Sequence, residues 1–112
     1  MAPARNSSLG DLEQLLLLAL LRLGDDAHGV SIRTELIDTA GRTLSPGAIY
    51  TAMNRLENRG LVGSSLGRPT TERAGKRRRI YEITPAGRAA IRDAYGRLRA
   101  MAEGVEADLG LA

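Results

Sequence analysis

The sequence contains no cysteine, no tryptophan, no phenylalanine and a single histidine. Without cysteine, the chain can form no disulfide, no thiolate nucleophile and no cysteine-ligated metal or iron–sulfur centre. His28 follows Asp25 and Asp26, but sequence neighbours at a helix start do not converge on one point as metal ligands must. We therefore expect His28 to act at a helix start or in packing, and we expect neither a metal nor a cofactor.

Long apolar runs and export signals are also missing. The longest apolar run covers residues 15–21, which is far too short to span a membrane. The N-terminal segment lacks the basic, apolar and small-residue regions of a secretory signal. Glycine-rich phosphate loops, dinucleotide fingerprints and serine nucleophile motifs are absent as well. We expect a cytoplasmic protein that has no enzymatic activity and no membrane partner.

The positive charge is modest, but nearly all of it is arginine. The chain of 112 residues has 16 Lys and Arg against 13 Asp and Glu, a net charge of +3, and Lys76 is its only lysine. A chain of this length forms one domain. Arginine offers a planar fork of donors that suits phosphates and guanine edges. Richness in Arg, Ala and Gly also accompanies a GC-rich genome, so the functional argument depends on where the arginines lie.

A helix expected over residues 46–59 has marked ends and two different faces. Ser45 can cap it, Pro46 fits its first position, and Gly60 can end it in the left-handed conformation. Helical periodicity turns an apolar group inward: Ile49, Ala52, Met53 and Leu56. The outward group is small and polar, flanked by Tyr50 and Arg55: Gly47, Thr51, Asn54 and Asn58. This outward face suits close approach to another surface.

Two helices are expected before it. The first covers residues 8–23, from a Ser-x-x-acid start at Ser8, and the second covers about 27–39, opened by two aspartates and ended by Gly41. The leucines of the first helix point to almost all of its sides, and a single small core can cover only one of those sides. A second subunit is expected on the other side, since a membrane-surface helix would need an opposing charged face. The second helix, a tight turn and the helix over 46–59 are typical of a helix-turn-helix.

After Gly60 the pattern predicts two strands, over 61–66 and 79–83, and a last helix from the Thr84 cap to about residue 103. The segment 68–79, mostly loop, has one acidic residue against six basic ones: Arg68, Arg73, Lys76, Arg77, Arg78 and Arg79. Such a charge run taken alone is commonly just solvated. The last helix carries a narrow apolar stripe that is typical of a coiled-coil dimer arm: Ile91, Tyr95, Leu98, Met101 or Ala102, and Val105.

These elements predict a mainly α chain with a small antiparallel β-hairpin, a winged helix-turn-helix that dimerises through its N- and C-terminal helices. The expected organisation is a flexible tail at 1–7, the winged helix at 8–83, a dimerisation helix at 84–105 and a frayed tail at 106–112. The predicted homodimer contacts lie on the two apolar helices: Leu12, Leu16, Ile91, Tyr95, Leu98, Ala102 and Val105.

The layout also predicts binding to double-stranded DNA. Thr51 and Asn54 are the candidates for base edges, since asparagine can pair bidentately with adenine, and Tyr50 and Arg55 would hold phosphates. The basic hairpin would follow the backbone or reach a minor groove. The predicted contacts are Ser45, Gly47, Tyr50, Thr51, Asn54, Arg55, Arg73, Lys76, Arg77 and Arg78. The open alternative is a ligand-sensing or protein-interaction module on the same fold without operator binding.

Four stretches, 27–32, 44–50, 55–62 and 77–88, resemble the PadR family of bacterial transcriptional regulators. The most specific are Leu-Ser-Pro-Gly-x-Ile-Tyr and Tyr-x-Ile-Thr-Pro-x-Gly, in that order along the chain. The resemblance implies a winged helix that dimerises through its first and last helices, binds a palindromic operator and usually represses. It also implies, for many members, release by small phenolic or cationic ligands.

The short last helix resembles that of the small PadR subtype, which has no separate C-terminal dimerisation domain. Two departures concern ligands. Val30 stands where the family often has an aromatic residue after His-Gly, and Tyr95 is the one aromatic residue on the last helix, where members that bind flat drugs use tryptophan. The identity of a small-molecule effector is therefore left open.

Overall fold

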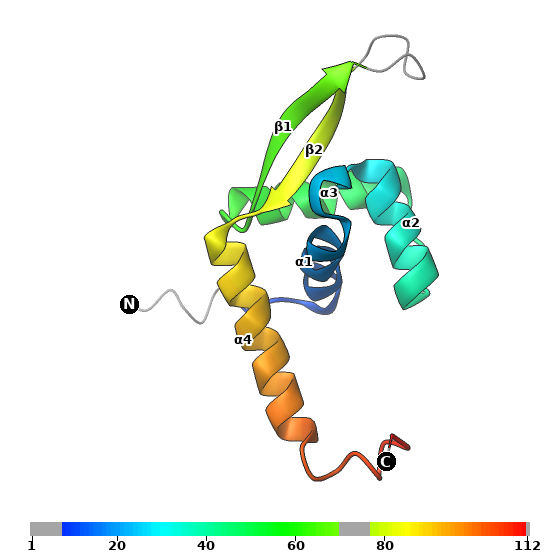
Figure 1. The fold of residues 1–112 in the computed structure, drawn as a ribbon, viewed down its shortest axis with the longest axis vertical. Helices are drawn as coiled ribbons and strands as arrows, with labels where there is room; N and C mark the ends of the chain where they lie inside the picture. The colour runs from blue at the N-terminus through cyan, green and yellow to red at the C-terminus, as the bar shows by residue number, and fades with distance from the viewer. Residues whose placement is uncertain (1–7, 70–76, 112) are drawn as a thin grey trace.

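The structure is a computed structural model that describes residues 8–69 and 77–111. In chain order, these residues form α1 (Asp11–Leu23), the short 3-10 turn η2 (Gly24–Asp26), α2 (Gly29–Ala40), α3 (Pro46–Asn58), β1 (Val62–Pro69), β2 (Arg77–Ile83) and α4 (Pro85–Ala102). Figure 1 shows α1 in the middle, with the hairpin rising on one side and α4 extending away from it. The predicted order of three helices, a hairpin and a last helix is confirmed.

The core forms around the inner side of α1. Its leucines meet the apolar faces of α2 and α3, the base of the hairpin and the first half of α4. The buried cluster consists of Leu16, Leu17, Leu20, Ala27, Ile32, Leu36, Ile49, Met53, Leu56, Leu61, Val62, Tyr81 and Ile91. The inward positions expected for the helix over 46–59 agree with this: Ile49, Met53 and Leu56 are buried and Ala52 packs against the cluster.

Two helix starts differ from the sequence prediction. α1 begins at Asp11 after Gly10, and the Glu13 carboxylate accepts the Gly10 N–H at 2.8 Å, so Ser8 is not the cap. α2 begins at Gly29, because the two aspartates lie in η2 and His28 takes the capping position. Its backbone N–H donates to Ser31 Oγ at 2.9 Å. The expectation that His28 serves a helix start is confirmed.

The hairpin is longer than predicted. Its antiparallel register pairs Val62 with Ile83 and Leu66 with Arg79, and after a shift Pro69 pairs with Arg77. The sequence prediction ended the strands early because it took glycine and proline for loop signals, whereas an edge strand with an irregularity tolerates both. The hairpin base is tied to the segment before α2: Tyr81 N–H donates to the Ala27 carbonyl at 2.8 Å.

α4 has its N-terminal end fixed against the start of the hairpin. Thr84 Oγ1 accepts the Gly87 N–H at 3.0 Å and donates to the Gly60 carbonyl at 2.7 Å. The first half of the helix packs on the core through Ile91 and Ala94, and the second half projects beyond it (Figure 1). The expected cap and proline start of this helix are therefore confirmed.

Two of the expected dimer contacts are corrected. Leu16 is 0% exposed and Ile91 is 4% exposed, so both side chains belong to the chain's own core and are not open to a second copy. The remaining predicted contacts are exposed or partly exposed: Leu12, Tyr95, Leu98, Ala102 and Val105. In residues 105–111 backbone hydrogen bonds close turns, including Leu111 N–H to the Glu106 carbonyl at 2.9 Å.

Candidate nucleic-acid interface

α3 presents a face of small and polar side chains outside the core. Ser45 Oγ accepts the Ala48 N–H at 3.1 Å, which caps the helix as the sequence predicted, and Pro46 follows at its first turn. Gly47, Tyr50, Thr51 and Arg55 are exposed, and Asn54 is half-buried. A Cβ at Gly47 would meet only Ser45 Oγ, at 4.0 Å. Packing inside the described chain therefore does not require glycine at this position.

Two arginines that the sequence prediction left out fix α3 in place. Arg33 of α2 donates through Nε to the Leu44 carbonyl at 2.6 Å, just before the cap of α3. At the other end, Arg59 donates to both carboxylate oxygens of Glu13 on α1, each at 2.9 Å. Arg59 makes both bonds from one nitrogen, Nη1, and Arg33 makes its bond from Nε. The orientation of the exposed face of α3 is thus set by contacts at both ends of the helix.

The arginines of β2 alternate between two environments, as side chains on a strand must. Arg77 is exposed. Arg79 donates to Ser64 Oγ at 2.9 Å, and Ser64 Oγ donates to the Glu57 carboxylate of α3 at 2.9 Å. Arg78 turns the other way, toward His28, with 2.8 Å between Nη1 and Nε2. Two other predicted contacts, Arg73 and Lys76, lie outside the described residues.

A cavity of about 340 Å³ lies where α2, α3 and β2 meet. Its apolar floor includes Ile49 and Tyr81, and three arginines and His28 stand around it. Pro46 and Tyr50, from the exposed start of α3, also line it, so the polar face of α3 and the basic strand border one hollow. The full lining is His28, Gly29, Val30, Arg33, Thr34, Pro46, Ile49, Tyr50, Arg78, Arg79 and Tyr81.

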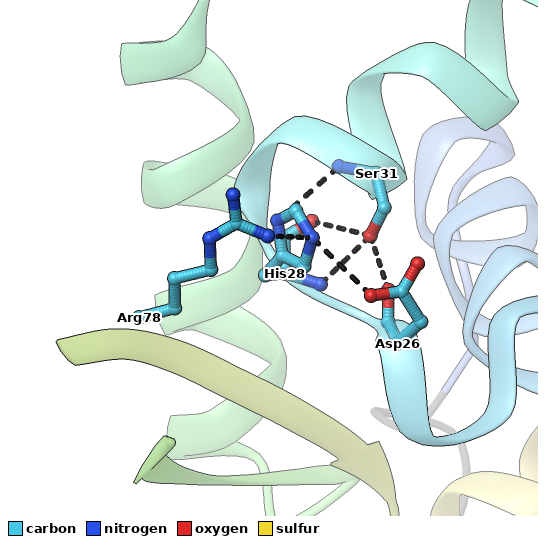
Figure 2. Close-up of polar contacts among 4 residues, drawn as sticks. All are labelled: Asp26, His28, Ser31 and Arg78. Carbon is cyan, nitrogen blue, oxygen red and sulfur yellow. Dashed lines mark hydrogen bonds and ion pairs between the residues drawn. The ribbon is translucent and has the colours of Figure 1, made fainter. Parts of the chain in front are cut away.

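Serine, histidine and aspartate meet beside this cavity, but not in a catalytic arrangement (Figure 2). Ser31 Oγ donates to the Asp26 carbonyl and accepts the His28 backbone N–H, so it makes no contact with an imidazole nitrogen. A serine nucleophile needs its hydroxyl on the base. Among the described residues no cluster of three metal-ligating side chains forms, and no helix is long and apolar enough to cross a membrane.

On this side of the molecule, the pKa of one side chain is shifted from its usual value. Burial raises the pKa of the Tyr81 phenol, whose side chain closes over the core at the base of the hairpin. The phenol is therefore neutral at physiological pH, and the positive charge around the cavity comes from Arg33, Arg78 and Arg79. This charge makes the surface suited to bind an anion.

A polar helix face beside a basic hairpin, on a core of three helices, defines a winged helix-turn-helix protein. The model of the "Transcriptional regulator PadR-like family" matches residues 17–93. The chain therefore belongs to the PadR-like transcriptional regulators, a family of regulators and not of enzymes.

Two relatives match by sequence. The "Transcriptional regulator Rv3488" of Mycobacterium tuberculosis is 39% identical over 69 residues, which cover 60% of this chain and 58% of that protein. An uncharacterized 37.1 kDa protein in transposon TN4556 of Streptomyces fradiae is 37% identical over 87 residues, 77% of this chain and 23% of that protein. The matched part thus spans less than two thirds of either relative.

Solved structures share the fold. A PadR family regulator from Eggerthella lenta has a TM-score of 0.66 at 26% identity, with 88% of this chain and 86% of that chain covered. One from Clostridium difficile has a TM-score of 0.69 at 22% identity over 89% and 98% of the two chains. Bacillus subtilis PadR in complex with operator DNA has a TM-score of 0.65 at 20% identity, over 76% of this chain and 46% of that chain.

Proposed function

We propose that the protein is a sequence-specific DNA-binding repressor that acts in the cytoplasm as a homodimer on a palindromic operator. The single observation that carries this proposal is the shared border of the cavity, where the exposed start of α3 and the arginines of β2 face the same space. The structure of Bacillus subtilis PadR in complex with operator DNA supports the same use of the fold.

In this proposal, α3 enters the major groove with its N-terminal end leading. Thr51 and Asn54 read base edges, and Tyr50 and Arg55 hold phosphates. Ser45 and Gly47 lie where the helix start approaches the backbone, and the absence of any internal need for glycine at Gly47 fits such an approach. The hairpin, with Arg77 and Arg78 on β2 and with Arg73 and Lys76, follows the adjacent backbone.

The homodimer would form through the leucines of α1 that the core leaves uncovered and through the projecting half of α4. Leu98 is 65% exposed and Met101 is 80% exposed, with Tyr95 and Val105 beside them in the helical repeat. An apolar stripe this exposed is typical of an interaction surface. Leu12 and Ala102 are the half-buried members of the same surface. A small-molecule effector that releases the DNA belongs to the proposal, and its identity is open.

The test is a binding measurement with a paired variant. We expect Thr51→Ala combined with Asn54→Ala to lose preference for a selected DNA site while retaining salt-sensitive binding to any DNA. Asn58→Ala, the same chemistry further along α3, should keep the preference and serves as the control. Fluorescence anisotropy on the selected site and on unrelated DNA measures both.

A double variant that discriminates between the two DNAs as well as the wild type would show that the reading face is elsewhere. The alternative function, a ligand-sensing or protein-interaction module without operator binding, predicts no salt-dependent DNA binding by the wild type.

A further inference from the structure

Nε2 of His28 lies between a guanidinium and a carboxylate (Figure 2). Nη1 of Arg78 is 2.8 Å away, and Oδ1 of Asp26, in the turn before α2, is 3.4 Å away. A guanidinium can only donate, so Nε2 must accept from Arg78, which requires a neutral imidazole. A protonated imidazole carries N–H at both nitrogens and can only donate. The same ring atom thus has one partner for each protonation state.

The second ring nitrogen is consistent with a neutral imidazole. Nδ1 lies 3.5 Å from the Ser31 N–H, at the limit of a hydrogen bond, whereas the contact to Arg78 is short. A neutral imidazole accepts at only one nitrogen, so the ring proton belongs on Nδ1 and Nε2 accepts. The start of α2 has a second, shorter bond, because Ser31 Oγ accepts the His28 N–H at 2.9 Å.

Charged and titratable residues from η2, α2, α3 and β2 lie around the cavity that His28 borders. From η2, Asp26 contacts the ring and Asp25 is exposed nearby. From β2 come Arg78 and Arg79, from α2 comes Arg33, and the phenols of Tyr50 and Tyr81 complete the cavity. Arg33 and Arg79 donate to the Leu44 carbonyl and to Ser64, respectively. Asp26 and Arg78 are therefore the charged groups set to respond to the ring.

We propose that His28 is a positioning residue for DNA binding: neutral, it holds the Arg78 guanidinium at the cavity, and protonated, it turns to Asp26 and releases that guanidinium to a DNA phosphate. This proposal rests on the proposed function. The buried Nε–H of Arg78 supports it, because it has no hydrogen-bond partner among the described residues. A phosphate oxygen is a strong partner for such a donor.

The backbone would stay in place while the side chain moves. His28 forms an isolated bridge with Ile80, and the neighbouring Ala27 carbonyl accepts the Tyr81 N–H at 2.8 Å. These bonds hold the base of β2 against the segment before α2 in either protonation state. The change is therefore confined to the Arg78 guanidinium and the imidazole.

The direction in which pH changes DNA affinity follows from the linkage between proton binding and DNA binding. If release of Arg78 to DNA needs a protonated His28, the DNA complex binds more protons than the free protein, and affinity must rise as pH falls. His28 is the only histidine in the chain, and histidine is the side chain whose ordinary titration lies between about pH 5 and 8. A comparison of the wild type with a His28 variant therefore separates the contribution of His28 from that of any other group that titrates in this range.

The first experiment measures DNA affinity of the full chain by fluorescence anisotropy at about pH 8 and about pH 5.5, over a series of salt concentrations. The wild type should bind about tenfold more tightly at the lower pH, the effect of a hydrogen bond to a charged group. Its salt slope should be steeper at the lower pH by about 0.9 for each additional phosphate that the protein neutralises.

Three variants assign the effect. His28→Asn keeps a good helix cap and should bind with the same salt slope at both pH values, and Arg78→Ala should do the same. Arg79→Ala is the matched control: it removes a neighbouring arginine whose partner is Ser64, so it should weaken binding yet keep the pH dependence. Equal salt slopes in the wild type, or an unchanged pH dependence in His28→Asn, would overturn the proposal.

The second experiment needs no DNA and separates this proposal from the proposed function. Proton NMR follows the one imidazole, and its titration midpoint should move to higher pH in Arg78→Ala and to lower pH in Asp26→Asn, by the loss of a neighbouring cation or anion. If the midpoint is the same in both variants as in the wild type, His28 does not interact with Arg78 and Asp26 as proposed. If the midpoints move but the wild type binds no DNA at either pH, the proposed function fails, and release to DNA fails with it.

Discussion

Gly87, in the first turn of α4, lies so close to the Leu61 carbonyl oxygen that a Cβ on it would stand 2.0 Å from that oxygen. The atom that would clash is backbone, and the same Leu61 carbonyl accepts the Thr84 N–H at 3.1 Å. The close approach of α4 to the hairpin base is therefore possible only because residue 87 is glycine and has no Cβ. This contact sets how closely the first turn of α4 approaches the base of the hairpin.

Gly87→Ala should destabilise the fold by about 3 kcal/mol, because a rigid backbone contact forces α4 away from the hairpin. Gly96→Ala is the matched control: it lies in the same helix, has nothing within 4 Å of the added Cβ, and should be neutral or stabilising. Thermal or urea unfolding measures both. Equal stability of the two variants would show that α4 tolerates a shift at its start.

Tyr81 should make the fold sensitive to alkali. Burial raises the pKa of its phenol above the ordinary 10.0, so above that pH the unfolded chain gives up a proton that the folded chain keeps. Linkage then lowers stability as pH rises through 10 and beyond. Tyr81→Phe should lose less stability than the wild type over this range, measured by unfolding at several alkaline pH values.

The control for Tyr81 is Tyr50→Phe, which changes the same group on a side chain that is 56% exposed and lies outside the proposed dimer surface. Its alkaline loss of stability should equal that of the wild type. If Tyr81→Phe also follows the wild-type curve, the phenol ionises as easily in the fold as outside it.

The projecting half of α4 should hold the homodimer together. A charge placed in the apolar stripe, as in Leu98→Glu, would have to be buried in the interface and should raise the dissociation constant more than tenfold. Leu66→Glu puts the same charge on an exposed leucine of the hairpin and should leave the dimer intact. Analytical ultracentrifugation of the wild type and the two variants measures the dissociation constant. A monomeric wild type would contradict the proposed homodimer, and with it the twofold operator.

The parts of the fold that could be predicted depend on local chemistry. Helix ends are fixed by residues within one turn of the end. The observed caps lie where the sequence predicted them, at Gly41, at Ser45 before Pro46, and at Thr84 before Pro85. The inward face of α3 followed from periodicity alone. These signals need no knowledge of distant residues.

The rest depends on contacts between residues far apart in sequence. On α1, leucine occupies so many positions that periodicity cannot tell Leu16, which is in the core, from Leu18, which is 38% exposed. Arg78 meets His28 across 50 positions of chain, and Arg59 meets Glu13 across 46. A run of arginines shows charge, but the fold decides which of them are held by partners within the chain.

Selection of bound DNA from a random pool is the sharpest test of a dimeric reader of DNA. We expect enrichment of a palindrome whose half-sites are centred about one helical turn apart, because two copies of α3 must reach successive major grooves. Thr51→Ala with Asn54→Ala should fail to enrich it. Recovery of no common sequence by the wild type, or of a single unrepeated half-site, would contradict a dimeric reader.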